Sequence, residues 1–62
     1  MTGTGRFIIP ANILNRYDEA VQMYNQGNYL RANAIIQQLL QNPDNQRFTQ
    51  IMELKRRIDA VL

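Results

Sequence analysis

The 62-residue sequence has no cysteine, no histidine and no tryptophan. Without cysteine the chain can form neither a disulfide nor a zinc–thiolate site. Without histidine it also lacks the usual imidazole base and metal ligand. Its five acidic residues do not form an acidic loop of the calcium-binding type. We therefore expect a protein that is not an enzyme and that holds no metal ion and no cofactor.

The sequence also lacks a long hydrophobic run. Residues 1–14 contain one basic residue, and their longest apolar stretch, Phe7–Ile9, ends at Pro10. A secretory signal needs an apolar region of roughly 7–15 residues, and a membrane span needs about 20. Neither is present, so we expect a soluble chain. The lack of both segments favours a cytoplasmic location, and the sequence does not identify the compartment further.

Basic residues only slightly outnumber acidic ones, and the formal net charge is +2. The basic residues cluster only at Lys55–Arg57, and Glu53 and Asp59 flank that cluster. A protein that neutralises several phosphates needs a stripe of bases along one face. Nucleic-acid binding is therefore the weakest of the functions considered, and it would use Arg47, Lys55, Arg56 and Arg57.

Hydrophobic residues recur at helical spacing in three segments, which predicts an all-α fold of three antiparallel helices over about 10–26, 29–41 and 46–62. These helices form a single domain over 10–62, after a flexible N-terminal arm over 1–9. In the arm, Phe7–Ile9 either folds back over the end of the core or docks as a strap on a neighbouring subunit.

The first predicted helix carries an apolar stripe of Ile13, Leu14, Tyr17, Ala20, Val21 and Tyr24. The face of the second is broader and includes Ala32, Ile35, Ile36, Leu39 and Leu40, which indicates burial on two sides. The third has Ile51, Leu54, Ile58 and Val61 in one row, with Phe48 and Met52 at its edge. We expect Gly27 and Asn28 to end the first helix, and Asp44 or Asn45 to cap the third.

The segment from Tyr17 to Pro43 resembles a tetratricopeptide repeat, a helical hairpin of about 34 residues. The resemblance lies in Tyr17-x-x-Ala20-Val21-x-x-Tyr24, in Gly27-Asn28-Tyr29-x-x-Ala32, and in Ile36, Leu39 and Pro43. It implies that the third helix caps the hairpin. If the sequence is aligned with the repeat motif without a gap, the inward-facing positions of the first helix are taken by Arg16, Glu19, Ala20 and Met23. We prefer the apolar stripe, because unpaired burial of Arg16 and Glu19 would cost several kcal/mol each at order of magnitude.

In that family the first helices line a groove that holds a peptide or a partner's helix. The resemblance therefore implies a partner-binding face of Leu14, Tyr17, Val21, Tyr24 and Asn25, although the same spacing is also typical of ordinary core residues. The first hypothesis is thus a protein–protein interaction module that acts as adaptor, assembly subunit or co-chaperone.

A structural subunit that assembles with copies of itself is the second hypothesis, because single repeats are normally stabilised by neighbours. The chain ends in apolar residues, Ala60–Leu62. We therefore expect either an excised piece of a longer repeat protein or a helix that a partner completes.

Overall fold

The computed structural model describes residues 8–62, and within this range the chain is all-α with no strand. The elements are α1 (Ala11–Asn25), α2 (Tyr29–Leu40), the short 3-10 helix η1 (Pro43–Arg47) and α3 (Thr49–Val61). The predicted all-α fold of three helices is confirmed. Most of the predicted arm, residues 1–7, lies outside the described residues. Of its last two residues, Ile8 is 92% exposed, whereas Ile9 packs against the core.

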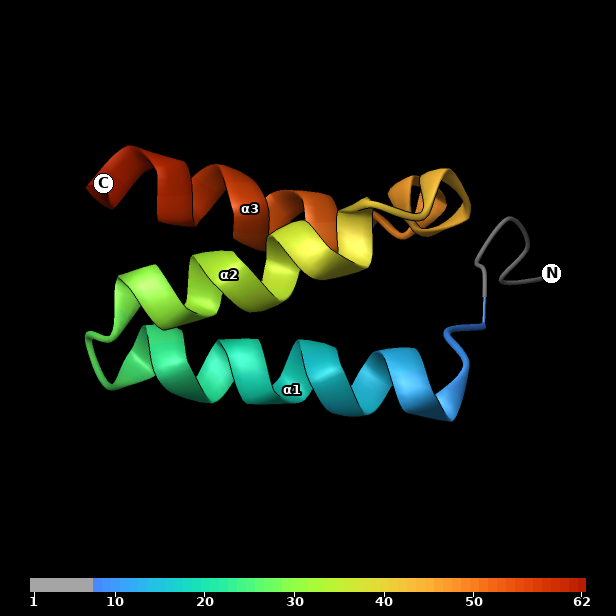
Figure 1. Cartoon of the computed structure of the whole chain (residues 1–62), viewed down its shortest axis with the longest axis horizontal. Coiled ribbons are helices and arrows are strands. Elements are labelled where there is room, and N and C mark those ends of the chain that lie inside the picture. The colour runs from blue at the N-terminus through green and yellow to red at the C-terminus, as the bar shows by residue number, and fades with distance from the viewer. Residues whose placement is uncertain (1–7) are drawn as a thin grey trace, which may run out of the picture.

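The three α-helices run antiparallel to their neighbours in the chain, and α2 lies between α1 and α3 (Figure 1). This position explains the broad apolar face that the sequence gives to α2, because one side of that face meets α1 and the other meets α3. Direct contact between α1 and α3 is slight. The core is therefore organised around the middle helix, and its buried apolar residues are Ala20, Ala32, Ile35, Ile36, Leu39, Phe48, Ile51, Leu54 and Ile58.

A glycine makes the tight connection between α1 and α2. Gly27 has φ +83°, a left-handed conformation that glycine adopts without the steric cost that a Cβ brings. The turn is closed by the backbone N–H of Asn28, which donates to the carbonyl of Met23 at 2.8 Å. The predicted stop at Gly27 and Asn28 agrees with this geometry, because α1 ends at Asn25 and α2 begins at Tyr29.

The connection between α2 and α3 differs from the prediction. Instead of capping α3, the side chain of Asn45 turns back, and its Nδ2 donates to the carbonyl oxygen of Leu39 at 2.7 Å. The segment before α3 forms η1, which Asn42 caps by accepting from the backbone N–H of Asp44. The third helix consequently begins at Thr49 rather than at Gln46, with Phe48 before it and no side-chain cap.

A polar contact also links α3 to α2. The Nζ of Lys55 donates to Oδ1 of Asn33 on α2 at 3.0 Å and lies 2.8 Å from Oδ1 of Asp59, one turn further along α3. Lys55 is thus directed towards the neighbouring helix, so it does not line up with the exposed residues Arg56 and Arg57 as one basic face.

Candidate functional site

The residues predicted to bind a partner lie on one side of α1, at helical spacings of three, four and seven. Tyr17, Val21 and Tyr24 are half-buried and pack against the core. Leu14 is 38% exposed, and Asn25 is exposed. We call these five residues the α1 face. The structure brings them together as a surface that is neither fully core nor fully solvated.

Tyr17 lies in the field of charges from α3 as well as from its own helix. Burial raises the pKa of its phenol, and the carboxylates of Asp18 and Glu53 raise it further, while the guanidinium of Arg57 opposes them. Glu53 and Arg57 both belong to α3. The phenol of Tyr17 is therefore within electrostatic range of these two charges on α3.

Tyr24 also has a structural contact. Its ring lies 5.3 Å from that of Tyr29, centroid to centroid, with the planes tilted by 60°. This is a favourable aromatic pair geometry, and it joins the end of α1 to the start of α2. Substitution of Tyr24 would therefore weaken the hairpin itself, which makes Tyr24 a poor probe of partner binding.

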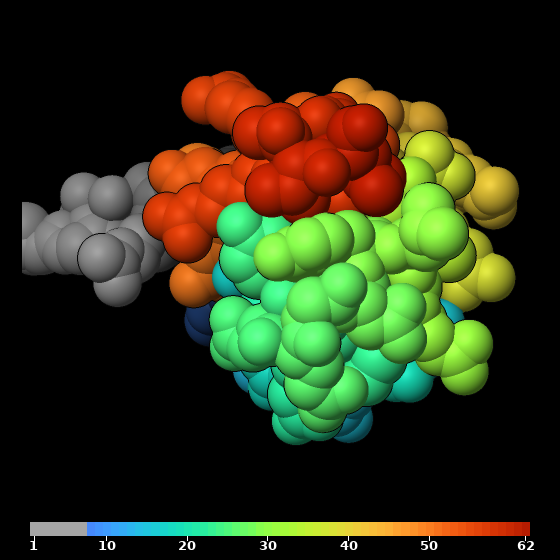
Figure 2. Space-filling model, turned by 90° about the vertical axis from the view of Figure 1, so that its left-hand side faces the viewer, coloured from blue at the N-terminus to red at the C-terminus, as the bar shows by residue number. Residues whose placement is uncertain are grey.

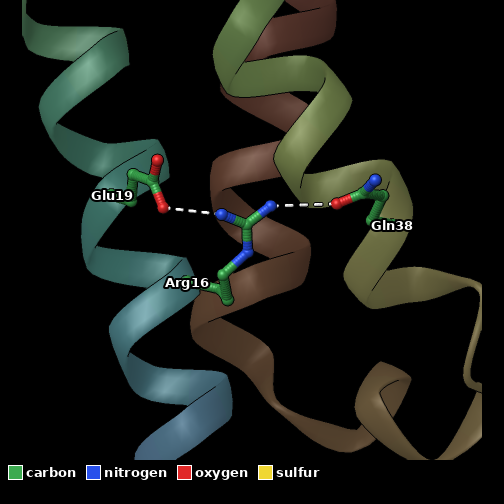
Figure 3. Close-up of polar contacts among 3 residues, drawn as sticks. All are labelled: Arg16, Glu19 and Gln38. Atoms are coloured by element: carbon green, nitrogen blue, oxygen red, sulfur yellow. Dashed lines mark hydrogen bonds and ion pairs between the residues drawn. The ribbon is translucent and has the colours of Figure 1, made fainter.

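The guanidinium of Arg16 on α1 contacts α2, which the apolar stripe did not predict. This group lies between two partners: Nη1 donates to Oε1 of Glu19 at 2.7 Å, and Nη2 donates to Oε1 of Gln38 on α2 at 2.9 Å (Figure 3). The charged side chains of Arg16 and Glu19 remain 43% and 46% exposed. The expected cost of burying them unpaired does not arise, because they are paired and half in water.

The apolar stripe is consequently only part of the α1 surface that packs. Of its members Ala20 alone is buried, and Met23, which the stripe left out, packs against the core. The other members Ile13, Tyr17, Val21 and Tyr24 pack against the core, as the stripe predicts, whereas Leu14 is 38% exposed. Helical periodicity identified the apolar side, but it did not show that a paired arginine would share the boundary with α2.

Three exposed apolar side chains lie at the end of the molecule that carries the α1–α2 turn and the C-terminus of α3, which is the end that faces the viewer in Figure 2. Leu30 is 75% exposed, Val61 47% and Leu62 58%. We call these three residues the apolar end patch. The sequence indicated exposed apolar residues at Val61 and Leu62, because they end the chain. It did not indicate that Leu30 is exposed, because Leu30 is one of several apolar residues in α2.

Two features are absent from the described residues. Within residues 8–62 there is no group of three or more acidic, histidine or cysteine side chains that could hold a metal ion. In the same range, no helix has both the length and the apolar character needed to cross a bilayer. What these residues do provide is partly covered apolar surface, which suits binding by shape.

Comparison with known proteins places the chain in a family. A family model described as TP_0855_C, C-terminal, matches residues 11–62. The chain belongs to the TP_0855_C family. A relative from Treponema pallidum (strain Nichols), described as an uncharacterized protein, is 38% identical over 63 residues. That match covers 100% of this chain, which spans only 6% of the relative's length. No solved structure matches the chain.

Membership of the TP_0855_C family corrects the assignment to the tetratricopeptide repeats, since the model that matches is not one of theirs. The motif that suggested the repeat has a general physical origin. A close helical hairpin needs small residues such as Ala20 and Ala32 where its helices touch, and a residue such as Gly27 where φ is positive. Unrelated hairpins meet the same requirements, so these residues do not identify a family.

Proposed function

We propose that the chain is a non-catalytic protein–protein interaction module, acting as an adaptor, assembly subunit or co-chaperone through the α1 face. The supporting observation is that α1 has 15 residues and an apolar stripe but only one buried residue, Ala20. Its larger apolar side chains are half covered by the fold. Partly exposed apolar surface bordered by polar residues is typical of interaction sites.

The chemistry of the α1 face suits an apolar side of a partner's helix. Leu14, Tyr17 and Val21 provide apolar area at the spacing by which helices dock against each other. Tyrosine contributes apolar area together with a hydroxyl group, and it is enriched among residues that dominate binding energy. The exposed amide of Asn25 adds a polar rim.

The relative's length supports the same function. This chain corresponds to 6% of that protein, and the family description places the matching region at a C-terminus. A short helical unit within a much longer chain is well suited to docking rather than to independent chemistry. A different protein then supplies the partner surface.

A photo-crosslinking amino acid placed at position 14 tests the proposal in cells that carry the gene. We expect a discrete adduct with a different protein from position 14. Position 22 is the matched control, because Gln22 is an exposed residue of α1 outside the α1 face. Equal adducts from the two positions, or none from position 14, would contradict the proposed role of the α1 face.

A structural subunit that assembles with its own copies is the second candidate, and the apolar end patch favours it. Leu30, a large aliphatic residue, is the most exposed of the three patch residues at 75%. If this patch joins copies, sedimentation equilibrium will give a mass that rises with concentration, and Leu30→Asp will restore the monomer. A wild-type chain that stays monomeric at all concentrations excludes this candidate.

A further inference from the structure

The five acidic side chains all lie within the described residues, and they differ in whether a basic side chain is paired with them. Three form ion pairs: Glu19 with Arg16 at 2.7 Å, Asp59 with Lys55 at 2.8 Å, and Asp44 with Arg47 at 3.9 Å. Within residues 8–62, Asp18 and Glu53 form none, and both are exposed. The fold therefore leaves the charges of these two carboxylates without a basic partner.

Both carboxylates act on the same group, the phenol of Tyr17 in the middle of the α1 face. Asp18 follows Tyr17 in α1, and Glu53 belongs to α3, which contacts α1. Burial raises the pKa of Tyr17 most, and the two carboxylates raise it further, whereas the guanidinium of Arg57 lowers it. Two negative charges and one positive charge thus lie within electrostatic range of the phenol, so this part of the α1 face is negative.

The negative region lies within a helix face that is otherwise uncharged. The other members of the α1 face are Leu14, Val21, Tyr24 and Asn25. A wholly apolar partner helix would displace water from the two carboxylates and give them no partner in return, which is unfavourable. An acidic side chain at the same place would be repelled, whereas a basic one would be attracted. The charge of the α1 face therefore selects among the helices that its apolar residues could bind.

We propose that the partner of the α1 face is an amphipathic helix of another protein that carries a lysine or arginine beside its apolar side. The apolar side of that helix packs on Leu14 and Val21, and its basic side chain lies near Tyr17, where Asp18 and Glu53 attract it. This inference rests on the proposed function and adds the charge of the partner to it.

The test uses three synthetic peptides of one amphipathic helical design, with leucines at helical spacing along one side. The positions that flank the leucines carry lysine in the first peptide, glutamine in the second and glutamate in the third. Fluorescence anisotropy measures their binding to the full chain. We expect the lysine peptide to bind about two- to fivefold more tightly than the glutamine peptide, the range of an exposed ion pair, and the glutamate peptide to bind most weakly. Added salt should reduce these differences, because it screens exposed charges.

Variants of the full chain that remove single charges locate the effect. Asp18→Asn and Glu53→Gln should each reduce the preference for lysine over glutamine, and Arg57→Gln should increase it. Asp44→Asn is the control with the same change in net charge. Asp44 lines an open hollow between the start of α1 and η1, and the lining of this hollow includes no residue of the α1 face. The Asp44 variant should therefore keep the wild-type preference.

One further variant separates this inference from the proposed function. Leu14→Asn removes apolar area from the α1 face without a change in charge, and Leu14 is exposed enough for the fold to tolerate it. If Leu14→Asn weakens all three peptides but they bind equally to the wild type, the α1 face binds a helix and the inference is overturned. A preference that Asp44→Asn lowers as much as Glu53→Gln does also overturns the inference. If no peptide binds, or Leu14→Asn changes nothing, the proposed function fails as well.

Discussion

Helices α1 and α2 are adjacent in the chain and similar in length, yet the fold uses them differently. Four residues of α2 are buried, Ala32, Ile35, Ile36 and Leu39, whereas α1 has one, Ala20. The reason is position: α2 packs on two neighbours, while α1 packs mainly on α2. Amphipathic patterning of similar strength thus produces a core helix in one place and a partly covered surface helix in the other.

The largest expected effect comes from truncating one β-branched side chain on each of the two helices. Ile36→Ala deletes a fully buried side chain of α2 and should lower the free energy of unfolding by about 2–5 kcal/mol. A domain of this size has only about 3–9 kcal/mol in total, so much of the population should unfold. Val21→Ala on α1 should cost about 1 kcal/mol or less, because Val21 is half-buried.

Urea denaturation followed by circular dichroism measures both variants. Comparable losses from Ile36→Ala and Val21→Ala would show that α1 contributes to the core as much as α2 does, against the difference in burial. Such a result would also remove the main support for the α1 face as an interaction surface.

A smaller effect is expected at the C-terminal end of α2. Asn45→Ala removes the donor to the Leu39 carbonyl and should cost about 1–3 kcal/mol, because it leaves a buried acceptor unpaired. Asn42→Ala is the control three residues earlier. Its contact with the N–H of Asp44 is exposed, so about 0.5–1 kcal/mol is expected. Thermal melts of the two variants should rank in this order, and the reverse order would contradict the role given to Asn45.

The polar link between α1 and α2 should contribute less. A double-mutant cycle on Arg16→Ala and Gln38→Ala should give a coupling energy of about 0.5 kcal/mol or less, since the arginine side chain is 43% exposed to water. The same cycle with Gln41→Ala in place of Gln38→Ala should give none, because no contact joins Arg16 to Gln41 within the described residues. A coupling above 1 kcal/mol would make this link a major stabiliser of the hairpin.

The smallest effect concerns the titration of Tyr17. Burial and the nearby carboxylates raise its pKa, so the phenol should ionise at a higher pH than a free tyrosine. The folded pKa lies above the unfolded one, so the associated stability is fully present below about pH 10 and is lost as the pH rises through the folded pKa. The absorbance titration of the wild type minus that of Tyr17→Phe isolates this group.

Two charge variants on α3 check the cause of the Tyr17 shift. Glu53→Gln should lower the pKa of Tyr17, and Arg57→Gln should raise it further. Shifts in the opposite directions, or none, would show that these two charges on α3 do not act on the phenol in the way described.

Much of the fold could be predicted from the spacing of apolar residues, because a helix that packs on one side must repeat them every three or four positions. Gly27 marked the first turn because few other residues adopt its backbone conformation. The second turn was less predictable. Both Asp44 and Asn45 are common capping residues, and nothing local shows that Asn45 would instead bond to Leu39, six positions earlier.

The candidate sites were less accessible to sequence reasoning than the fold. The α1 face could be located from the pattern, but how far Leu14 and Val21 would be covered depends on the packing of the other helices. The role of Arg16 depends on Gln38, which is distant in sequence and near only after the hairpin closes. The open hollow between the start of α1 and η1 depends on how these two segments lie together, so no local sequence pattern predicts it.

The central position of α2 also has a kinetic consequence. Its two large helix–helix contacts join it to the α-helices before and after it in the chain, across the α1–α2 turn and across the segment that contains η1, so each forms by closing a short connection. Loop closure over short distances costs little entropy, and proteins dominated by local contacts fold in microseconds to milliseconds. The chain can therefore start folding from either hairpin, α1–α2 or α2–α3, and the other terminal helix then adds to an α2 that is already formed.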